Sequence, residues 1–435
     1  MIKNLTVKII VDKLNYNLNN PTSTNRTKSS SGTGFFIKNN FILTCYHVVS
    51  NHVKISISHQ SSRKKKLPVT VHSVYPDDDL AVLYIDDNMK PKSINITNGI
   101  PIHTLTKNLS DEENNVIVLG YPLNSKYLKT SKGILSGFQE SLFQTDATLN
   151  PGNSGGPLIW NNKIIGINVA KITSDKVDNV GYAIPIERFI IYKNNFITEQ
   201  KLKLYQKPVL GAEFQYIENT EQFKRFNINL KTTSEPYGIR LINYLQDSIF
   251  DNAGLKYGDF LLEWDGRKID IYGDINVNVY PEKVNINEIC KWYYNGQEIK
   301  IKYYSISKKE ENTKTIKLNI PSSHIPMLYK NYTDNFFHVV SNITIGVITK
   351  EHFENIDKLK LEIEDKVYII NNYLNMENKF IIYLVNQIPN KHSISLPEGT
   401  VITKLNNQVI NNYMELKNIN NIDKIDFYSG KTFYL

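Results

Sequence analysis

"TLNPGNSGGPLIW", Thr148 to Trp160, sets three glycines around one serine, Ser154, and closes on an apolar run. Glycine loses more conformational entropy on folding than any other residue, so such a cluster indicates a special backbone requirement. A serine hydroxyl becomes nucleophilic when a base removes its proton, and acyl transfer then needs N–H donors for an oxyanion. We expect Gly152 to permit an unusual turn, and Gly155 and Gly156 to let a substrate backbone approach. The stretch therefore predicts a nucleophilic serine beside an oxyanion hole.

The same residues also fit the Gly-x-Ser-x-Gly elbow of α/β-hydrolases. That elbow needs a helix directly after the serine, with the acid and the histidine later in the chain. Here Gly155, Gly156 and Pro157 oppose a helix start, and a strand-like run follows. The suitable histidine and aspartate candidates lie earlier in the chain, so the elbow interpretation is rejected.

One of the nine histidines, His47, follows the strand-like run "FILTCY" and precedes two valines. A lone histidine in such a place is more often a hydrogen-bonded core residue, but a glycine-framed serine favours a catalytic base. A carboxylate should orient the imidazole. In "YPDDDLAVLYID" Asp79 abuts the apolar strand and should be partly buried, whereas Asp77 and Asp78 are expected in a turn. The predicted triad is His47, Asp79 and Ser154, in that chain order.

The length of 435 residues indicates two to four domains. Short runs rich in Val, Ile, Tyr and Phe, bounded by Gly, Pro, Asn or Asp, predict a mainly β protein of barrels or sandwiches, with a helix closing the first domain near residue 198. The net charge of +8 is scattered, and the run Arg63–Lys66 is interpreted as a solvated turn rather than a nucleic-acid site or localisation signal. We therefore expect neither nucleic acid nor a membrane as a partner.

The two cysteines, Cys45 and Cys290, have neither metal-binding nor disulfide-framework spacing. They favour a reducing intracellular compartment such as the cytoplasm. We see no signal peptide and no apolar run long enough to span a bilayer.

Six pieces, in this order, resemble the HtrA (Deg) family of chymotrypsin-fold serine proteases: "SGTGFFI", "ILTCYHVV", "DLAVLYI", "TDATLNPGNSGGPLI", "IIGINVA" and "VGYAIPI". They cover most of residues 30–190. The resemblance implies two six-stranded β-barrels with the active site between them, His47 as general base, Asp79 as its orienting acid and Ser154 as nucleophile. The backbone N–H groups of Gly152, Asn153 and Ser154 would form the oxyanion hole, and no cofactor or metal is implied. The family usually has Asn-Ala before the histidine, where this chain has Cys45 and Tyr46; the bulkier Tyr46 could reshape the wall near His47.

Specificity is expected to be for small or medium apolar side chains. Thr148 stands six residues before the serine, where trypsin-like enzymes carry an aspartate, and the strand "GINVAK" should line the primary pocket. The resemblance also implies a homo-oligomer, commonly a trimer built through the protease units.

Residues 199–322 resemble a PDZ domain, because "SIFDNAGLKYGDFLLEWDG" matches its pattern. Such domains add a peptide C-terminus as a strand and hold its carboxylate on backbone N–H groups. The loop for this would be Leu210, Gly211, Ala212 and Glu213, although the acid Glu213 is unfavourable beside a carboxylate. A PDZ fold that only docks on the protease is the alternative. Residues 323–435 are predicted to be a second, divergent PDZ-like domain, because "PEGTVITKLNNQVI" echoes the first.

The sequence thus predicts a protease domain at residues 1–198, followed by the two PDZ-type domains. The expected function is that of a serine endopeptidase acting on unfolded or partner polypeptides through an acyl-enzyme. The alternative is a catalytically silent scaffold or chaperone that binds peptides.

Overall fold

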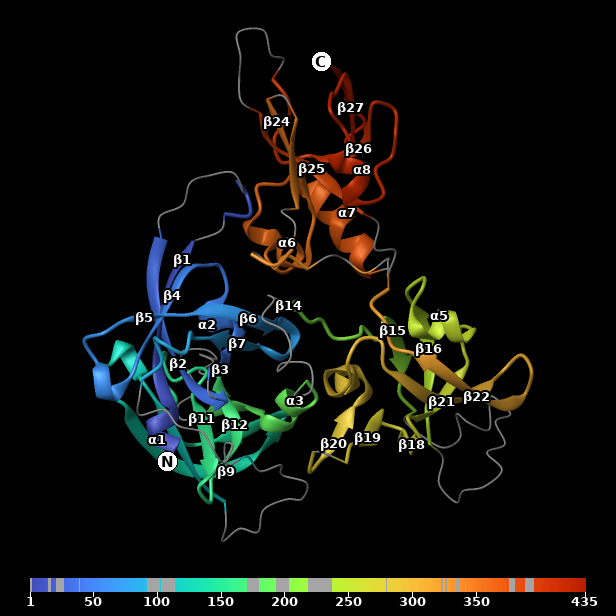
Figure 1. The fold of residues 1–435 in the computed structure, drawn as a ribbon. Helices are drawn as coiled ribbons and strands as arrows, with labels where there is room; N and C mark the ends of the chain where they lie inside the picture. Colours follow the sequence, from blue (N-terminus) through green and yellow to red (C-terminus); the bar gives the residue numbers. More distant parts are fainter. Residues whose placement is uncertain are drawn as a thin grey trace. The chain divides into compact units, whose positions relative to one another are not determined.

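The computed structural model describes most of the chain (Figure 1). The described residues are 2–14, 17–20, 27–38, 40–91, 102, 114–169, 180–192, 203–217, 237–278, 280–321, 324, 327–329, 331–333, 336–340, 342–374, 380–387 and 395–435. They form two compact units. Unit 1 comprises 1–14, 27–242 and 252–320, and unit 2 comprises 15–26, 243–251 and 321–435.

The first sheet of unit 1 has eight strands in the order β14-β6-β7-β3-β2-β1-β4-β5. Strand β1, which is paired on both sides, shows why these residues form a sheet: Val7, Ile9 and Val11 alternate along the strand and are fully buried. The strands are β1 (Thr6–Leu14), β2 (Thr27–Lys38), β3 (Phe41–Cys45), β4 (His52–Ser58), β5 (Leu67–Pro68), β6 (Thr70–Tyr75), β7 (Leu80–Tyr84) and β14 (Lys203–Leu204). A short helix, α1 (Ile2–Leu5), precedes β1. The count exceeds the six strands that the resemblance implied by two, and the two strands at the edges are short: β5 pairs with β4, and β14 joins β6 in parallel from far along the chain.

The second sheet closes into a six-stranded barrel in the order β10-β13-β12-β11-β8-β9. Its strands are β8 (Asn115–Gly120), β9 (Lys129–Gln139), β10 (Leu142–Thr145), β11 (Pro157–Trp160), β12 (Lys163–Val169) and β13 (Gly181–Pro185). The helix expected after β13 is only five residues long, α3 (Ile186–Ile190), and residues 193–202 lie outside the description.

A third sheet has the order β15-β16-β17-β21-β22, and β18 pairs with β17. Its strands are β15 (Ala212–Gln215), β16 (Ile239–Tyr244), β17 (Phe260–Trp264), β18 (Arg267–Lys268), β21 (Glu298–Ser305) and β22 (Glu310–Lys317). The helix α5 (Ile249–Ala253), the pair β19 (Asp274–Asn276) and β20 (Lys283–Asn285), and the 3₁₀ helix η4 (Ile286–Trp292) lie in its connections. Buried Asp259 holds the Gly-Asp turn, since its carboxylate accepts the backbone N–H groups of Lys256 and Ile306 at 2.9 and 3.1 Å.

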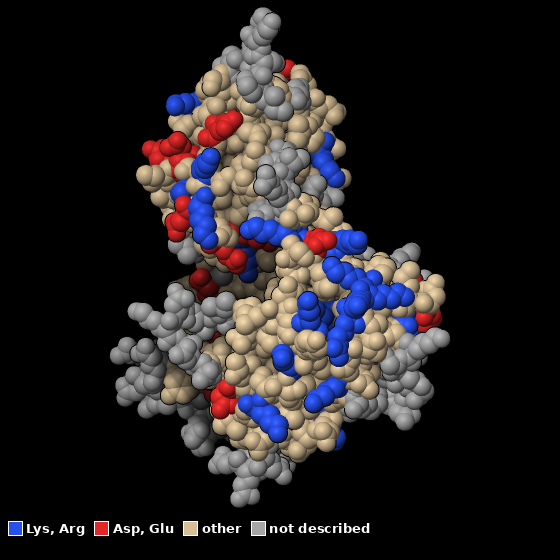
Figure 2. Space-filling model, turned by 90° about the vertical axis from the view of Figure 1, so that its left-hand side faces the viewer, with Lys and Arg blue, Asp and Glu red and all other residues tan. Residues whose placement is uncertain are grey.

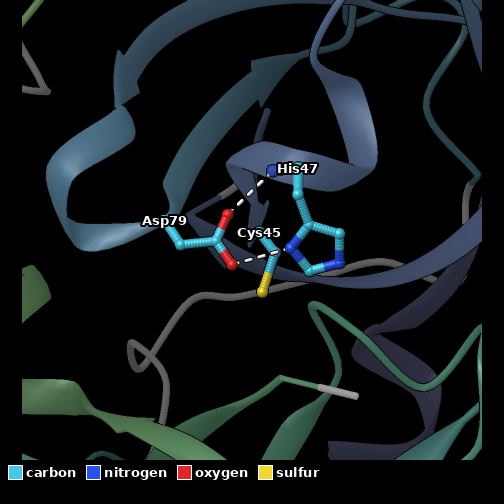
Figure 3. Close-up of side chains that lie close together, drawn as sticks. All are labelled: Cys45, His47 and Asp79. Carbon is cyan, nitrogen blue, oxygen red and sulfur yellow. Dashed lines mark hydrogen bonds and ion pairs between the residues drawn. The ribbon is translucent and has the colours of Figure 1, made fainter. Parts of the chain in front are cut away.

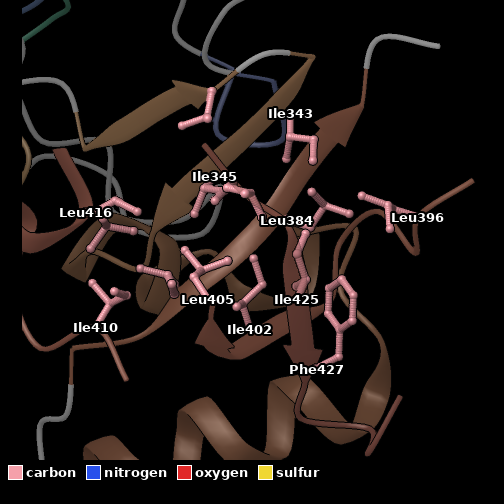
Figure 4. Close-up of a cluster of buried hydrophobic side chains, with 14 residues drawn as sticks. Ile343, Ile345, Leu384, Leu396, Ile402, Leu405, Ile410, Leu416, Ile425 and Phe427 are labelled. Carbon is pink, nitrogen blue, oxygen red and sulfur yellow. The ribbon is translucent and has the colours of Figure 1, made fainter. Parts of the chain in front are cut away.

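Unit 2 contains an antiparallel sheet in plain sequence order, β23 to β28. Its elements are β23 (Phe337–Val340), β24 (Ile343–Val347), α6 (Lys350–Glu354), η5 (Ile356–Lys358), α7 (Ile363–Leu374), β25 (Ile382–Gln387), β26 (Val401–Leu405), α8 (Tyr413–Lys417), β27 (Lys424–Phe427) and β28 (Thr432–Tyr434). Figure 4 shows its main apolar core, in which Ile345, Leu384 and Ile425 are fully buried. Apolar burial of this kind stabilises by about 25 cal/mol per Å².

Charge is distributed much as the sequence predicts. Arg63–Lys66 lie exposed in the connection between β4 and β5. On the face drawn in Figure 2, Lys and Arg side chains occur in several groups and are more prominent than Asp and Glu. Within the described part of the chain, none of the helices has the length and apolar character needed to cross a bilayer.

Candidate active site

His47 and Asp79 meet on neighbouring connections of the first sheet (Figure 3). His47 lies in the short helix α2 (Tyr46–Val49) directly after β3, and Asp79 lies between the 3₁₀ turn η2 (Pro76–Asp78) and β7. One Asp79 oxygen, Oδ2, is 2.7 Å from His47 Nδ1, and the other, Oδ1, accepts the His47 backbone N–H at 2.8 Å. The two side chains are 46% and 31% exposed. The carboxylate therefore orients the imidazole, and the ring remains open to solvent.

Backbone contacts hold this pair in register. The Tyr46 N–H donates to the Asp79 carbonyl at 2.9 Å, and the Lys13 ammonium donates to the His47 carbonyl. Tyr46 departs from the family pattern in its side chain, but its backbone N–H helps to position Asp79.

Cys45 completes a group of three whose ligand atoms lie within 4.8 Å of one another, together with His47 and Asp79 (Figure 3). Burial, and then the charge of Asp79, raise the pKa of the Cys45 thiol well above its ordinary value. Metal binding requires a thiolate, and His47 Nδ1 already faces a carboxylate oxygen. The group is therefore better suited to hydrogen bonding than to holding a metal.

Ser154 lies in the connection between β10 and β11 and is 5% exposed. Thr33 of β2 joins this connection to the first sheet. Its backbone N–H donates to the Ser154 carbonyl at 2.9 Å, its hydroxyl donates to the Gly152 carbonyl at 2.7 Å, and the Tyr121 N–H donates to that hydroxyl at 3.0 Å. Thr44 on β3 in turn donates to the Thr33 carbonyl at 2.7 Å. The serine connection is thus attached to the strands that lead to His47.

A second attachment runs through β12. The Asn168 carbonyl accepts the Gly155 N–H at 2.8 Å and lies 3.4 Å from the Cys45 Sγ. The Asn168 carbonyl oxygen thus links Gly155, which follows Ser154, to Cys45, which lies two residues before His47.

The structure bears out the role expected for Gly152 but not the one expected for Gly155 and Gly156. Gly152 has a φ of +104°, which confirms the unusual turn. Gly155 has a φ of +84°, and a Cβ there would lie 2.2 Å from the Thr33 carbonyl oxygen and from Thr44 Oγ1. A Cβ on Gly156 would lie 2.2 Å from the Leu119 carbonyl oxygen. The expectation that Gly155 and Gly156 make room for substrate was therefore wrong, because the protein's own backbone fills that space.

One of the three expected oxyanion donors is engaged elsewhere. The Asn153 N–H donates to the Asn150 carbonyl at 2.9 Å and closes a tight turn. Asn153 is therefore not an oxyanion donor in this geometry, which leaves Gly152 and Ser154 from the predicted set.

The chain is similar to several known serine proteases. Residues 32–167 match the family model for a trypsin-like peptidase domain. The chain is 28% identical over 314 residues to the Serine protease Do-like HtrA of Bacillus subtilis, covering 67% of this chain and 66% of that protein. It is 26% identical over 367 residues to the Putative protease Do-like 13 of Arabidopsis thaliana, covering 81% and 70%. The HtrA-type protease AlgW, solved with a tripeptide, aligns over 73% of this chain and 94% of its own with 20% identity and a TM-score of 0.52.

These similarities support an HtrA-family serine protease. The chymotrypsin-like fold class expected for the first part of the chain is confirmed. The matches span about two thirds of the length of these curated HtrA relatives.

The sequence interpretation missed that one acidic residue is deeply buried. Asp78, expected as a turn residue, is 1% exposed. Arg188 Nε donates to its Oδ1 at 2.7 Å, the Tyr192 hydroxyl donates to its Oδ2 at 3.0 Å, and Lys207 Nζ forms an ion pair with Oδ2 at 3.0 Å. Burial alone would raise the pKa of Asp78, but the Arg188 and Lys207 charges outweigh it and hold that pKa below its ordinary value. The local pattern "PDDDL" carries no sign of partners more than a hundred residues away.

The other expected site residues remain predictions. Thr148 is exposed in the serine connection, but residues 170–179, which include the end of "GINVAK", lie outside the described residues. Leu210 and Gly211 are buried, and Ala212 and Glu213 begin β15, with Glu213 exposed.

The Thr33 hydroxyl provides a direct test of the link between the first sheet and the closed barrel. Thr33→Val keeps the shape of the side chain but leaves the Gly152 carbonyl and the Tyr121 N–H buried without this partner. We expect the free energy of unfolding to fall by about 1–3 kcal/mol. Urea unfolding measures this, and Thr33→Ser, which keeps the hydroxyl, is the matched control. Little loss in Thr33→Val together with a larger loss in Thr33→Ser would mean that the methyl group, not the hydrogen bonds, matters.

The lowered pKa of Asp78 makes a pH-dependent contribution to stability. Because the folded-state pKa lies below the unfolded one, the contribution is complete above the ordinary carboxyl range and is lost as the pH falls below about 4. Asp78→Asn leaves two buried cations uncompensated and should cost about 3–5 kcal/mol at pH 7, with a smaller difference from wild type at pH 3. Urea unfolding at both pH values measures this. Asp87→Asn, at an 82% exposed side chain, should cost less than about 1 kcal/mol.

Proposed function

We propose that the chain is a serine endopeptidase that hydrolyses peptide bonds of unfolded or partner polypeptides. His47 is the general base and then the general acid, Asp79 orients it, and Ser154 is the nucleophile that forms the acyl-enzyme. The backbone N–H groups of Gly152 and Ser154 are the proposed oxyanion donors. The observation that carries the proposal is the His47–Asp79 pair, in which both carboxylate oxygens engage the histidine.

The chemistry follows from this arrangement. With Asp79 facing Nδ1, that nitrogen carries the ring proton and Nε2 is left to accept the proton of an attacking hydroxyl. The resulting imidazolium is stabilised by the adjacent carboxylate and then protonates the leaving amine. Losing one oxyanion donor typically costs about 2.7–4 kcal/mol of barrier, so the rigid attachment of the Gly152 turn through Thr33 favours catalysis.

A fluorophosphonate probe tests the nucleophile. We expect the wild type to be labelled and to cleave an unfolded protein such as reduced casein, and Ser154→Ala to do neither. Asp79→Asn should keep KM and lower kcat by about 10⁴-fold, because the histidine then adopts the wrong tautomer. Ser58→Ala, at a serine that ends β4 and whose hydroxyl donates to the Arg63 carbonyl, is the matched control and should behave as wild type.

The competing function is a silent scaffold or chaperone that binds polypeptides without hydrolysis. Absence of labelling and of casein cleavage in folded wild-type protein, with binding of casein retained, would establish that alternative.

We also propose that the third sheet binds peptide C-termini beside β15. β15 is the terminal strand of its sheet, which is where an added strand can pair. Gly211 has a φ of +61°, as a loop that turns its N–H groups towards a carboxylate requires, and Leu210 is buried beside it. Along β15 the exposed Glu213 alternates with half-buried residues, so its side chain is on the solvent side of the strand.

Fluorescence anisotropy with a labelled apolar-ended peptide tests this site. The peptide with a free C-terminal carboxylate should bind, and the same peptide with a C-terminal amide should bind at least about tenfold more weakly, because charge-assisted hydrogen bonds are lost. Equal binding of both peptides, or of neither, would favour a PDZ fold that only docks on the protease.

A further inference from the structure

The turn that presents Asp79 to His47 is held in an uncommon conformation. Asp79 has a φ of +51°, in the left-handed region, and follows the 3₁₀ turn η2. A non-glycine residue there costs roughly 1–3 kcal/mol, so the surrounding structure must maintain it. The Asp79 N–H donates to the Pro76 carbonyl at 2.9 Å, which ties the position of Asp79 to that of η2. Whatever anchors η2 therefore determines where the Asp79 carboxylate points.

The anchors of η2 come from residues that follow the nucleophile in the chain. Arg188 lies in α3, after the last strand of the closed barrel, and both its Nε and Nη2 contact Asp78 Oδ1, at 2.7 and 2.6 Å. Tyr192 and Lys207 contact the other oxygen, Oδ2. Arg188 and Lys207 have side chains only 4% and 6% exposed, and that of Asp78 is fully buried. One carboxylate thus gathers two cations and a hydroxyl in a site closed to solvent.

The segment around Lys207 is attached to the same turn by its backbone. β14 pairs in parallel with β6, the strand that runs into η2, with Lys203 opposite Ser73 and Leu204 opposite Val74. Tyr205 stacks on Tyr75 with ring centroids 4.8 Å apart and planes at 6°. The Lys207 backbone N–H then donates to Asp77 Oδ2 at 2.7 Å. The chain that leads on to the third sheet is therefore built into the support of the acid-bearing turn.

Stability alone does not account for such a cluster. A buried ion pair is often no more stabilising than well-packed apolar residues of the same size, since desolvation offsets the attraction. Its distinctive property is directional, because the guanidinium and the carboxylate restrict each other's geometry. A residue directly beside the catalytic acid is where such precision affects rate.

We propose that Arg188 and Lys207 are positioning residues for catalysis. They hold Asp78, and through the η2 turn they set the orientation of Asp79 and hence of His47. The segment after the protease barrel is in this way part of the catalytic apparatus rather than a passive linker. This inference rests on the proposed endopeptidase function.

A double-mutant cycle between Arg188 and Asp79 tests it, with kcat and KM measured on a small ester or peptide substrate. Arg188→Met should lower kcat by about 10- to 100-fold with KM within about twofold, as expected for a misplaced catalytic group. In an Asp79→Asn background the same change should cost less than about twofold, because the route through Asp79 is already lost. Arg188→Lys should recover part of the loss, and Lys207→Met should behave as Arg188→Met does.

Controls separate positioning from general damage. Arg267→Met breaks a partly exposed arginine–aspartate pair with Asp265 in the same unit and should leave kcat unchanged. Tyr192→Phe removes one hydrogen bond from Asp78 and is the milder variant should Arg188→Met fail to fold. A loss in kcat of the same size in the wild-type and the Asp79→Asn backgrounds would overturn the proposal and leave a purely structural role.

Failure of the proposed function can be told apart from failure of this inference. If the wild type shows no turnover or labelling, the low-field proton resonance of the His47–Asp79 hydrogen bond reports on the geometry directly. That resonance should be present in the wild type and in Arg267→Met, and absent or shifted in Arg188→Met or Tyr192→Phe. An unchanged resonance in those variants would overturn the positioning role.

Discussion

The site depends on the hydrogen bonds by which one threonine, Thr33, joins the first two sheets. Thr33 uses its N–H, its hydroxyl and its carbonyl at once, towards Ser154, Gly152, Tyr121 and Thr44. Three of these contacts are made with connections of the closed barrel, and the fourth is made with β3, the strand that precedes the helix of His47. Because the contacts are buried, none can be exchanged for water without cost. The connection that carries Ser154 and the strand that leads to His47 are therefore joined through Thr33.

This joining of the two sheets also explains the glycine pattern. A chain that brings its own carbonyl oxygens within reach of Gly155 and Gly156 leaves no space for a Cβ. Gly155 and Gly156 therefore serve close packing within the chain rather than the approach of a substrate. Gly152 and Gly155 also have positive φ values. The positive φ values and the close approach occur in the same few residues, and glycine is the residue type that meets both requirements.

Much of the site could be predicted from the sequence, since its signals are local. The spacing of short strands indicated the β class, and the settings of His47 and Asp79 selected two residues that the structure brings into contact. What escaped prediction is non-local: the burial of Asp78 depends on Arg188 and Lys207, and the eight-stranded first sheet depends on β14 arriving from residues 203–204. The engagement of the Asn153 amide with Asn150 depends on the detailed path of a turn, which residue types alone do not specify.

The two C-terminal sheets show how the faint sequence echo between them translates into structure. The strand order β15-β16-β17-β21-β22 of one sheet corresponds to the order β24-β25-β26-β27-β28 in the other. The similar segments "YGDFLLEWDGRKI" and "PEGTVITKLNNQVI" contain β17 and β26. Each of these two strands is the middle one of its five. The helices differ: α5 lies between the second and third strands of the first run, whereas α6 and α7 precede the second strand of the other. A paired strand requires side chains that alternate between its two faces. A helix in a connection requires apolar residues only on the face that it buries. The closing half of the repeat therefore remains recognisable where strands follow one another closely, and the opening half, where the helices were placed differently, does not.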